Sequence, residues 1–180
     1  SSFLAERGVR VASARAGNVI GGGDWGEDRL VPDIMRGALA GQAIPIRRPD
    51  AVRPWQHVLN PLHGYLTLAQ AAWDDPAHAT AYNFGPDDAD AQPVAAVVER
   101  LSERWDGPLA IVTDEGPHPH EATYLKLDSS RAKARLGWRP TWDLARGLDA
   151  TAQWYLALRD GAPAADTTDA QIRRFAEDAA

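Results

Sequence analysis

The chain has 180 residues, of which 44% are hydrophobic and 24% are charged, and its formal net charge is −6. This is the composition of an ordinary globular protein, and the length suits one domain or two incomplete ones. The negative charge argues against a nucleic-acid partner, and no apolar run approaches the ~20 residues that cross a bilayer. The absence of cysteine excludes disulfides and thiolate metal sites and fits the reducing cytosol, so we expect a cytoplasmic protein with no membrane partner.

The first residues resemble the end of a helix. Phe3 and Leu4 lead into a polar turn that closes at Gly8, as at a helix C-cap. The only methionine is Met35, so the sequence does not open on an initiator residue. We therefore expect the chain to begin inside a fold, although processing can also remove an initiator methionine.

Strands and helices alternate along the first half of the chain. Residues 9–15 predict a strand that runs into the glycine-rich loop 16–24. An apolar stripe then predicts a helix that stops at Gly41, and a strand follows at 44–46. Beyond these we expect a helix over 59–73 and a strand at 80–85. The apolar residues of the expected helices are Leu30, Ile34, Ala38 and Leu39 in the first, and Leu62, Leu66, Ala69 and Trp73 in the second.

The second half continues the same pattern. We expect a helix over 92–105, a strand at 108–112, a polar loop at 114–120, a helix from Asp128 to Gly137 and a helix over 143–158. The segment 161–169 is rich in Ala, Asp and Thr, which is typical of a flexible linker, and a short helix would follow it. The sequence thus predicts an α/β unit over residues 1–160 and a tail over 161–180. Its strands are too few for a complete doubly wound sheet, so the rest of the sheet is expected upstream.

The loop after the first strand is the first candidate site. Arg15 and Asn18 lie where the strand ends, and the carboxyl edge of an open α/β sheet is where ligands bind. The Asn18 amide offers both a donor and an acceptor to a sugar hydroxyl or a phosphate oxygen. The run Gly21–Gly23 either lets the backbone approach a ligand closely or permits a positive φ in a turn.

Three segments carry a family resemblance, namely residues 15–25, 28–33 and 53–59. With Tyr82-Asn83-Phe84-Gly85 and the closing 136–140, they resemble the CDP-glucose 4,6-dehydratases of the extended short-chain dehydrogenase/reductase superfamily. The resemblance covers roughly residues 1–158. It implies the C-terminal part of an extended Rossmann-type fold, including the smaller substrate-binding domain.

The resemblance also implies roles for individual residues. Asn18 would lie beside the substrate pyrophosphate, Arg29 would contact substrate, Arg53 would grip the pyrophosphate, and Asn83 would lie near the nucleotide. A guanidinium fork suits phosphate oxygens, although a lone arginine is more often a solvated surface charge. Arg15 and Asn18 are also candidate cofactor contacts.

Glu121 follows His118 and His120 in a segment that matches a family loop closing over the nucleotide. Two histidines and a glutamate on a proline-rich loop make a poor metal site, so we expect no metal. Core packing is expected for Trp73, Trp105, Trp138, Trp142 and Trp154, whereas Trp25 and Trp55 fall in the candidate site.

Two motifs of the superfamily do not occur in the sequence. The cofactor motif Gly-x-x-Gly-x-x-Gly is absent, since Gly21–Gly23 has another spacing. The proton-transfer pair Tyr-x-x-x-Lys is also absent, because Tyr124 and Lys126 are only two residues apart and no tyrosine lies four residues before Lys133. The resemblance therefore places the nicotinamide domain and the catalytic tyrosine upstream, and we expect no catalytic residue in this chain.

By family, the intact enzyme would convert CDP-glucose to CDP-4-keto-6-deoxyglucose with bound NAD, within deoxysugar biosynthesis for O-antigen or lipopolysaccharide. It would be a homodimer, and this chain would supply nucleotide-sugar binding without turning the substrate over alone. Two alternatives stay open. One is another extended dehydratase or epimerase for a different nucleotide sugar, and the other is a non-catalytic nucleotide-sugar-binding domain.

Overall fold

The computed structural model describes residue 4, residues 6–114, residue 116 and residues 122–180. Within this part, short strands pair in three separate groups. In the first group, β1 (Ser13–Ala16) pairs in parallel with β5 (Ala81–Phe84). In the second, β2 (Asn18–Ile20) pairs in parallel with β4 (Val52–His57), and β4 pairs antiparallel with β6 (Ala91–Pro93). In the third, β3 (Ile44–Ile46) pairs in parallel with β7 (Ile111–Thr113).

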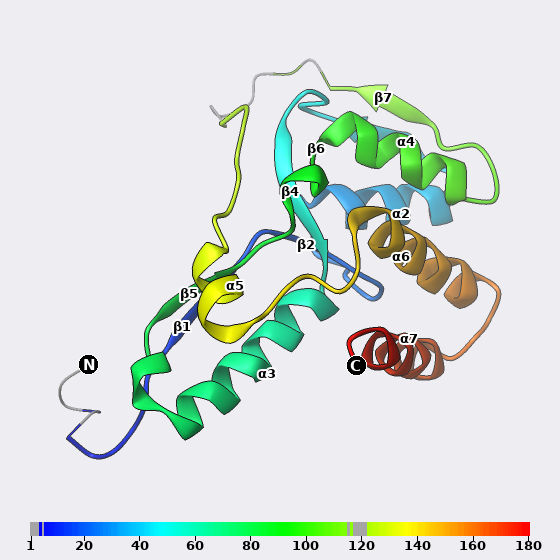
Figure 1. The fold of residues 1–180 in the computed structure, drawn as a ribbon. Coiled ribbons are helices and arrows are strands. Elements are labelled where there is room, and N and C mark those ends of the chain that lie inside the picture. The colour runs from blue at the N-terminus through cyan, green and yellow to red at the C-terminus, as the bar shows by residue number, and fades with distance from the viewer. Residues whose placement is uncertain (1–3, 5, 115, 117–121) are drawn as a thin grey trace.

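The helices divide between the two ends of the molecule. Figure 1 shows α3 (Leu59–Asp74) and α5 (Ser130–Leu136) beside the β1–β5 pair. At the other end, α2 (Leu30–Ala40), α4 (Val94–Arg104) and α6 (Leu144–Arg159) lie near the remaining strands, and α7 (Ala164–Asp178) lies beside α6. Short 3₁₀ turns follow α3 at Pro76–His78 and precede β6 at Asp88–Asp90.

Several predicted boundaries are confirmed, each with a local cause. The helix α2 ends at Gly41, whose φ of 62° is the left-handed conformation of a C-cap glycine. The helix α6 begins after Asp143, whose side chain accepts a hydrogen bond from the Arg146 backbone N–H. The strand at 44–46, the helix after residue 58 and the strand before Gly85 also form as expected.

Several predicted elements are shorter than expected. The strand expected at 108–112 forms only at Ile111–Thr113, and the helix expected from Asp128 begins at Ser130. The strand expected over 9–15 begins only at Ser13, where pairing with β5 begins, and Val9 and Val11 are exposed before it. The helix expected from residue 92 begins at Val94. Proline disfavours helical backbone in the residue before it, so Gln92 is extended and pairs with Arg53 across β4 and β6.

The C-terminal segment differs from the expected linker and short helix. The helix α7 begins at Ala164, inside the expected linker, and extends over 15 residues. Its Phe175 is buried against Trp142, with ring centroids 5.2 Å apart. Thr168 Oγ1 accepts a hydrogen bond of 2.9 Å from the Trp154 indole of α6. The segment 161–180 is poor in large apolar residues, so the sequence did not indicate that its single aromatic residue, Phe175, would be buried. This residue packs α7 against Trp142.

Within the described part of the chain, the core consists of three clusters of buried residues. The largest lies among α2, α4, α6 and the strands β2, β3 and β4, the second lies between α3, α5 and β5, and the third surrounds Trp142 and Phe175. Trp105, Trp138, Trp142 and Trp154 are buried, as predicted. No helix within the described residues is long and apolar enough to cross a membrane.

Trp73 contradicts the prediction of core packing, because its exposed fraction is 82%. The helix α3 packs through another face, which includes Gly64, Leu68 and Ala72. A β-carbon at Gly64 would overlap the Phe84 ring, so this face approaches β5 closely. Trp73 lies on the opposite side of the helix, together with the exposed Leu62 and Leu66.

Candidate functional site

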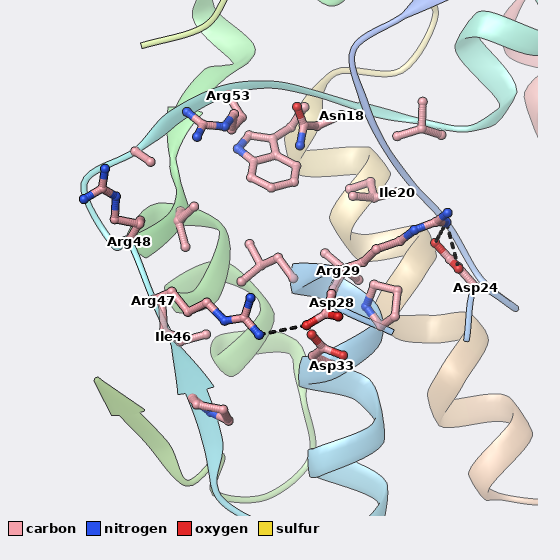
Figure 2. A pocket seen from close by; sticks show the side chains of 18 residues that line it. Asn18, Ile20, Asp24, Asp28, Arg29, Asp33, Ile46, Arg47, Arg48 and Arg53 are labelled. Atoms are coloured by element: carbon pink, nitrogen blue, oxygen red, sulfur yellow. Dashed lines mark hydrogen bonds and ion pairs between the residues drawn. The ribbon is translucent and has the colours of Figure 1, made fainter. Parts of the chain in front are cut away.

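A cavity of about 510 Å³ lies between β2, the start of α2 and the ends of β3 and β4. This volume is within the range of small-molecule sites in proteins. Figure 2 shows the side chains that line it. The polar and charged ones come from segments far apart in the sequence: Asn18, Asp24, Asp28, Arg29, Asp33, Arg47, Arg48 and Arg53.

Strand pairing brings Asn18 and Arg53 to the same cavity. Asn18 on β2 lies opposite Trp55 on β4, and Arg53 precedes Trp55 by two residues. Residues two apart project to the same side of a strand, and both Asn18 and Arg53 line the cavity. The Trp55 indole is fixed at 2.9 Å from the Gln92 carbonyl oxygen, to which it donates a hydrogen bond.

Arg53 also connects β4 to the segment that begins at Ala122. Its Nη1 donates to the carbonyl oxygens of Ala122 at 2.8 Å and of Val52 at 2.9 Å. These bonds hold the guanidinium at the cavity wall. Arg53 therefore has both a structural contact and a place in the cavity.

Arg29 lies directly before the first residue of α2. It is the N-cap residue of that helix, and its Nη1 lies 3.1 Å from Asp24 Oδ2 and 3.3 Å from Asp24 Oδ1. Asp24 Oδ1 also accepts a hydrogen bond of 3.0 Å from the Gly26 backbone N–H, so the carboxylate is held in place. The helix N-terminus carries partial positive charge, which adds to that of the guanidinium.

Aromatic residues of α6 fix the glycine loop that bears Asp24. A β-carbon at Gly22 would overlap the Trp154 indole, and Gly23 has a φ of 79°. The Tyr155 hydroxyl donates a hydrogen bond of 2.5 Å to the Asp24 carbonyl oxygen, and Trp25 meets the Tyr155 ring edge-on. Burial, followed by the nearby Asp24 charge, raises the pKa of Tyr155 to about 12. Packing and turn geometry thus account for Gly22 and Gly23 without a ligand.

Some predicted site residues lie outside this cavity. Asn83 on β5 donates a hydrogen bond of 2.9 Å to the Asp128 carbonyl oxygen and does not line the cavity. Arg15, its partner in the β1–β5 register, is exposed and is also absent from the lining. Glu121, with His118 and His120, lies outside the described residues.

Five charged residues of the lining were not predicted as site residues: Asp24, Asp28, Asp33, Arg47 and Arg48. Asp28 Oδ1 lies 2.8 Å from Arg47 Nη2, and this hydrogen bond is the main reason why the pKa of Arg47 is raised. Burial is the main reason why the pKa of Asp33 is raised. The position of Arg47 and Arg48 directly after a parallel strand was the signal that could have pointed to them.

Metal ligation receives no support from the described residues, which contain no group of three or more His, Cys, Asp or Glu that could hold an ion. The chemistry of the cavity is instead that of polar recognition. Guanidinium groups, carboxylates and an amide line the cavity together with the apolar side chains of Val31, Ile46 and Trp55.

Solved structures define the class of fold. The chain matches a Bacillus anthracis dTDP-glucose 4,6-dehydratase in complex with NAD at a TM-score of 0.64 and 20% identity, over 89% of this chain and 49% of that one. It matches a Bacillus cereus UDP-glucuronic acid 4-epimerase in complex with UDP-glucuronic acid and NAD at a TM-score of 0.73 and 15% identity, over 87% of this chain and 48% of that one. The fold is therefore part of the Rossmann-type extended short-chain dehydrogenase/reductase fold, which confirms the predicted fold class.

Two sequence relatives are dehydratases that act on nucleotide sugars by name. The chain is 47% identical over 153 residues to a CDP-glucose 4,6-dehydratase of Salmonella typhimurium, which is 84% of this chain and 43% of that protein. It is 26% identical over 136 residues to a dTDP-glucose 4,6-dehydratase of Xanthomonas campestris, which is 72% of this chain and 38% of that protein. No protein-family model matches the chain. The match to the Salmonella typhimurium protein confirms the resemblance that the sequence predicted. The chain spans less than half the length of the curated relatives it matches.

Proposed function

We propose that this chain is the nucleotide-sugar-binding, C-terminal part of an NAD-dependent CDP-glucose 4,6-dehydratase. The observation that carries the proposal is the convergence of Asn18, Arg29 and Arg53 on one cavity, in a chain 47% identical to such an enzyme. The intact enzyme would form CDP-4-keto-6-deoxyglucose from CDP-glucose. We also propose a cytoplasmic location, and a place in deoxysugar biosynthesis for O-antigen or lipopolysaccharide follows as the finer expectation.

Within the cavity we assign the pyrophosphate to Arg53 and Asn18, with Arg29 as a further substrate contact. A guanidinium fork donates two parallel hydrogen bonds to phosphate oxygens, and the Asn18 amide donates a third. Asn83 and Glu121 stay predictions from the family, Asn83 because it lies outside the cavity lining and Glu121 because it lies outside the described residues.

NAD is the cofactor we propose for the intact enzyme. The two structural relatives named above are complexes with NAD. The residues of this chain do not by themselves fit a dinucleotide, because the sequence holds no Gly-x-x-Gly-x-x-Gly motif. Arg15 and Asn18 are the candidate contacts at the carboxyl edge of β1. We accordingly place the dinucleotide cradle, the catalytic tyrosine and the homodimer contacts in the remainder of the intact enzyme.

The test is direct titration of the purified chain with nucleotide sugars by calorimetry. CDP-glucose should bind, dTDP-glucose and UDP-glucose should bind more weakly, and no 4-keto product should form when NAD is added. Turnover by the chain alone would contradict the assignment of catalysis to the remainder of the enzyme. Absence of binding for all three nucleotide sugars would overturn the proposal itself.

The titration tests the first alternative, and the upstream coding sequence tests the second. Another extended dehydratase or epimerase would prefer dTDP-glucose, UDP-glucose or a GDP-sugar to CDP-glucose. A non-catalytic binding domain would bind CDP-glucose, but its coding sequence would hold no Tyr-x-x-x-Lys shortly before Ser1. The coding sequence upstream of Ser1 therefore separates an enzyme from a binding domain.

A further inference from the structure

A largely exposed ion pair in the cavity lining joins two segments that no feature of the sequence had linked. Asp28 comes from the turn before α2, and Arg47 comes from the segment directly after β3. Asp28 Oδ1 lies 2.8 Å from Arg47 Nη2, and both residues line the cavity (Figure 2). Asp28 has a φ of 58° and is the only non-glycine residue in the left-handed region among the described residues. Such conformations cluster at ligand sites.

The charges of the cavity are separated along its length. Figure 2 shows Arg53 and Asn18 together at one end, with Arg48 on the same side, and Asp28, Asp33 and Arg47 together near the start of α2. A pyrophosphate is an anion, so its place is at the basic end. The acidic end suits an uncharged group that donates hydrogen bonds to carboxylates. The apolar side chains of Leu30, Pro45 and Ile46 also line the cavity and offer contacts to the face of a planar ring.

We propose that the Asp28–Arg47 pair recognises the cytosine base of the nucleotide and sets the preference for CDP over UDP. This rests on the proposed function, and it adds the residues that select the base. Cytosine presents an exocyclic amino donor beside the acceptors N3 and O2. A carboxylate next to a guanidinium presents the complementary order of one acceptor and several donors.

The same pair disfavours uracil and thymine. These bases present the O4 carbonyl where cytosine has its amino group, so a carboxylate would face another acceptor. Rejection by an unmatched polar group is a strong source of specificity. Within the described residues, only Oδ1 of Asp28 has a hydrogen-bond partner, so Oδ2 is free to accept from the amino group.

The hexose is the other part of the ligand that could occupy the acidic end, because sugar hydroxyls also donate to carboxylates. Binding of CDP distinguishes recognition of the base from recognition of the hexose, since CDP carries the base and the pyrophosphate but no hexose. The conservative variant Asp28→Asn is well suited to the test. Asparagine tolerates the left-handed conformation as aspartate does, and its amide can turn a donor toward the uracil O4.

The experiment measures the affinity of the chain for CDP, UDP and CDP-glucose by calorimetry, in the unmodified protein and in Asp28→Asn. We expect the unmodified chain to bind CDP at least about tenfold more tightly than UDP, and the variant to reduce this ratio to within about threefold. The matched control is Asp169→Asn on the exposed side of α7, which should leave the ratio unchanged. Circular dichroism of each variant checks that the fold is kept.

Three outcomes would count against the proposal, and they differ. If Asp28→Asn still folds and binds CDP with an unchanged preference over UDP, the pair does not read the base. If the variant weakens CDP-glucose but not CDP, the pair contacts the hexose instead. If the unmodified chain binds none of the three ligands, the proposed function fails, and the base assignment fails with it.

Discussion

Arg53 combines a structural contact with a proposed ligand contact, and the two can be separated by mutation. If Arg53 grips the pyrophosphate, Arg53→Ala removes a charge-assisted contact of roughly 1.5–3 kcal/mol, so CDP-glucose affinity should fall about ten- to a hundredfold. Arg53→Lys should recover only part of the loss, because an ammonium keeps the charge but not the planar fork. Calorimetry on both variants measures these effects, with Arg173→Ala on the exposed side of α7 as the matched control.

The hydrogen bond from Arg53 to the Ala122 carbonyl supplies the competing explanation. If that bond is the whole role of Arg53, Arg53→Ala should lower the melting temperature and leave the affinity unchanged. That result would remove Arg53 from the ligand site.

We expect the burial of His57 to make the stability of the fold depend on pH. Its side chain is 1% exposed, and its Nε2 has no hydrogen-bond partner among the described residues. Burial lowers the pKa of His57 from 6.5 to about 4. Between these values the unfolded chain binds a proton that the folded chain does not, so the free energy of unfolding falls as the pH falls through this window.

The expected loss between about pH 7 and about pH 5 is roughly 2 kcal/mol from this residue alone. Urea unfolding at both values measures it. His57→Asn keeps an acceptor near the Leu59 N–H, which donates to Nδ1 at 3.4 Å, but it does not titrate. The variant should be less stable at both values and should show a smaller difference between them. An unchanged difference would mean that His57 is not the titrating group.

At the level of elements, the sequence predicted best where local chemistry decides the structure. The boundaries of α2 at Gly41 and of α6 at Asp143 follow from capping residues that act over a few positions. The convergence of Asn18, Arg29 and Arg53 could be expected from the family resemblance. The contribution of Asp28 and Arg47 could not, because it depends on how the segment after β3 folds back against the start of α2. The packing of α7 through Phe175 also depends on a contact between distant segments, in this case with Trp142, so the sequence of α7 alone did not predict it.

Phe175 should carry much of the docking of α7. It packs edge-on against Trp142, with ring centroids 5.2 Å apart, and against His63 at 6.0 Å. Phe175→Ala removes a buried aromatic ring, so the free energy of unfolding should fall by roughly 3 kcal/mol in urea denaturation. Ile172→Ala, on the exposed side of the same helix, should change it by no more than about 0.5 kcal/mol. Equal effects of the two variants would show that α7 is not anchored through Phe175.

Across the whole molecule, an apolar surface remains uncovered at the end that holds β1 and α3. We define the α3 face as Leu62, Leu66, Ala69 and Trp73, and Leu66 is 72% exposed. A groove of about 670 Å³ beside it is lined by residues that include Val9, Ala12 and Tyr65. Arg10 also lines the groove, and its guanidinium donates hydrogen bonds to the carbonyl oxygens of Ala72 and Trp73. Contiguous apolar surface of this kind marks an interaction site or an aggregation risk, unlike isolated exposed side chains.

We therefore expect the α3 face to bind an apolar dye and to promote self-association of the isolated chain. The double variant Leu66→Gln with Trp73→Gln should lower dye fluorescence and the associated fraction in analytical ultracentrifugation, because it breaks the stripe at two of its four positions. Since both side chains are exposed, each substitution should change the free energy of unfolding by no more than about 0.5 kcal/mol. Ile172→Gln is the matched control, because it replaces an exposed apolar residue on α7, away from this face. If the double variant binds as much dye as the unmodified chain, the exposed stripe is not the apolar surface that the dye detects. If it unfolds instead, these side chains contribute to the core of the protein in solution.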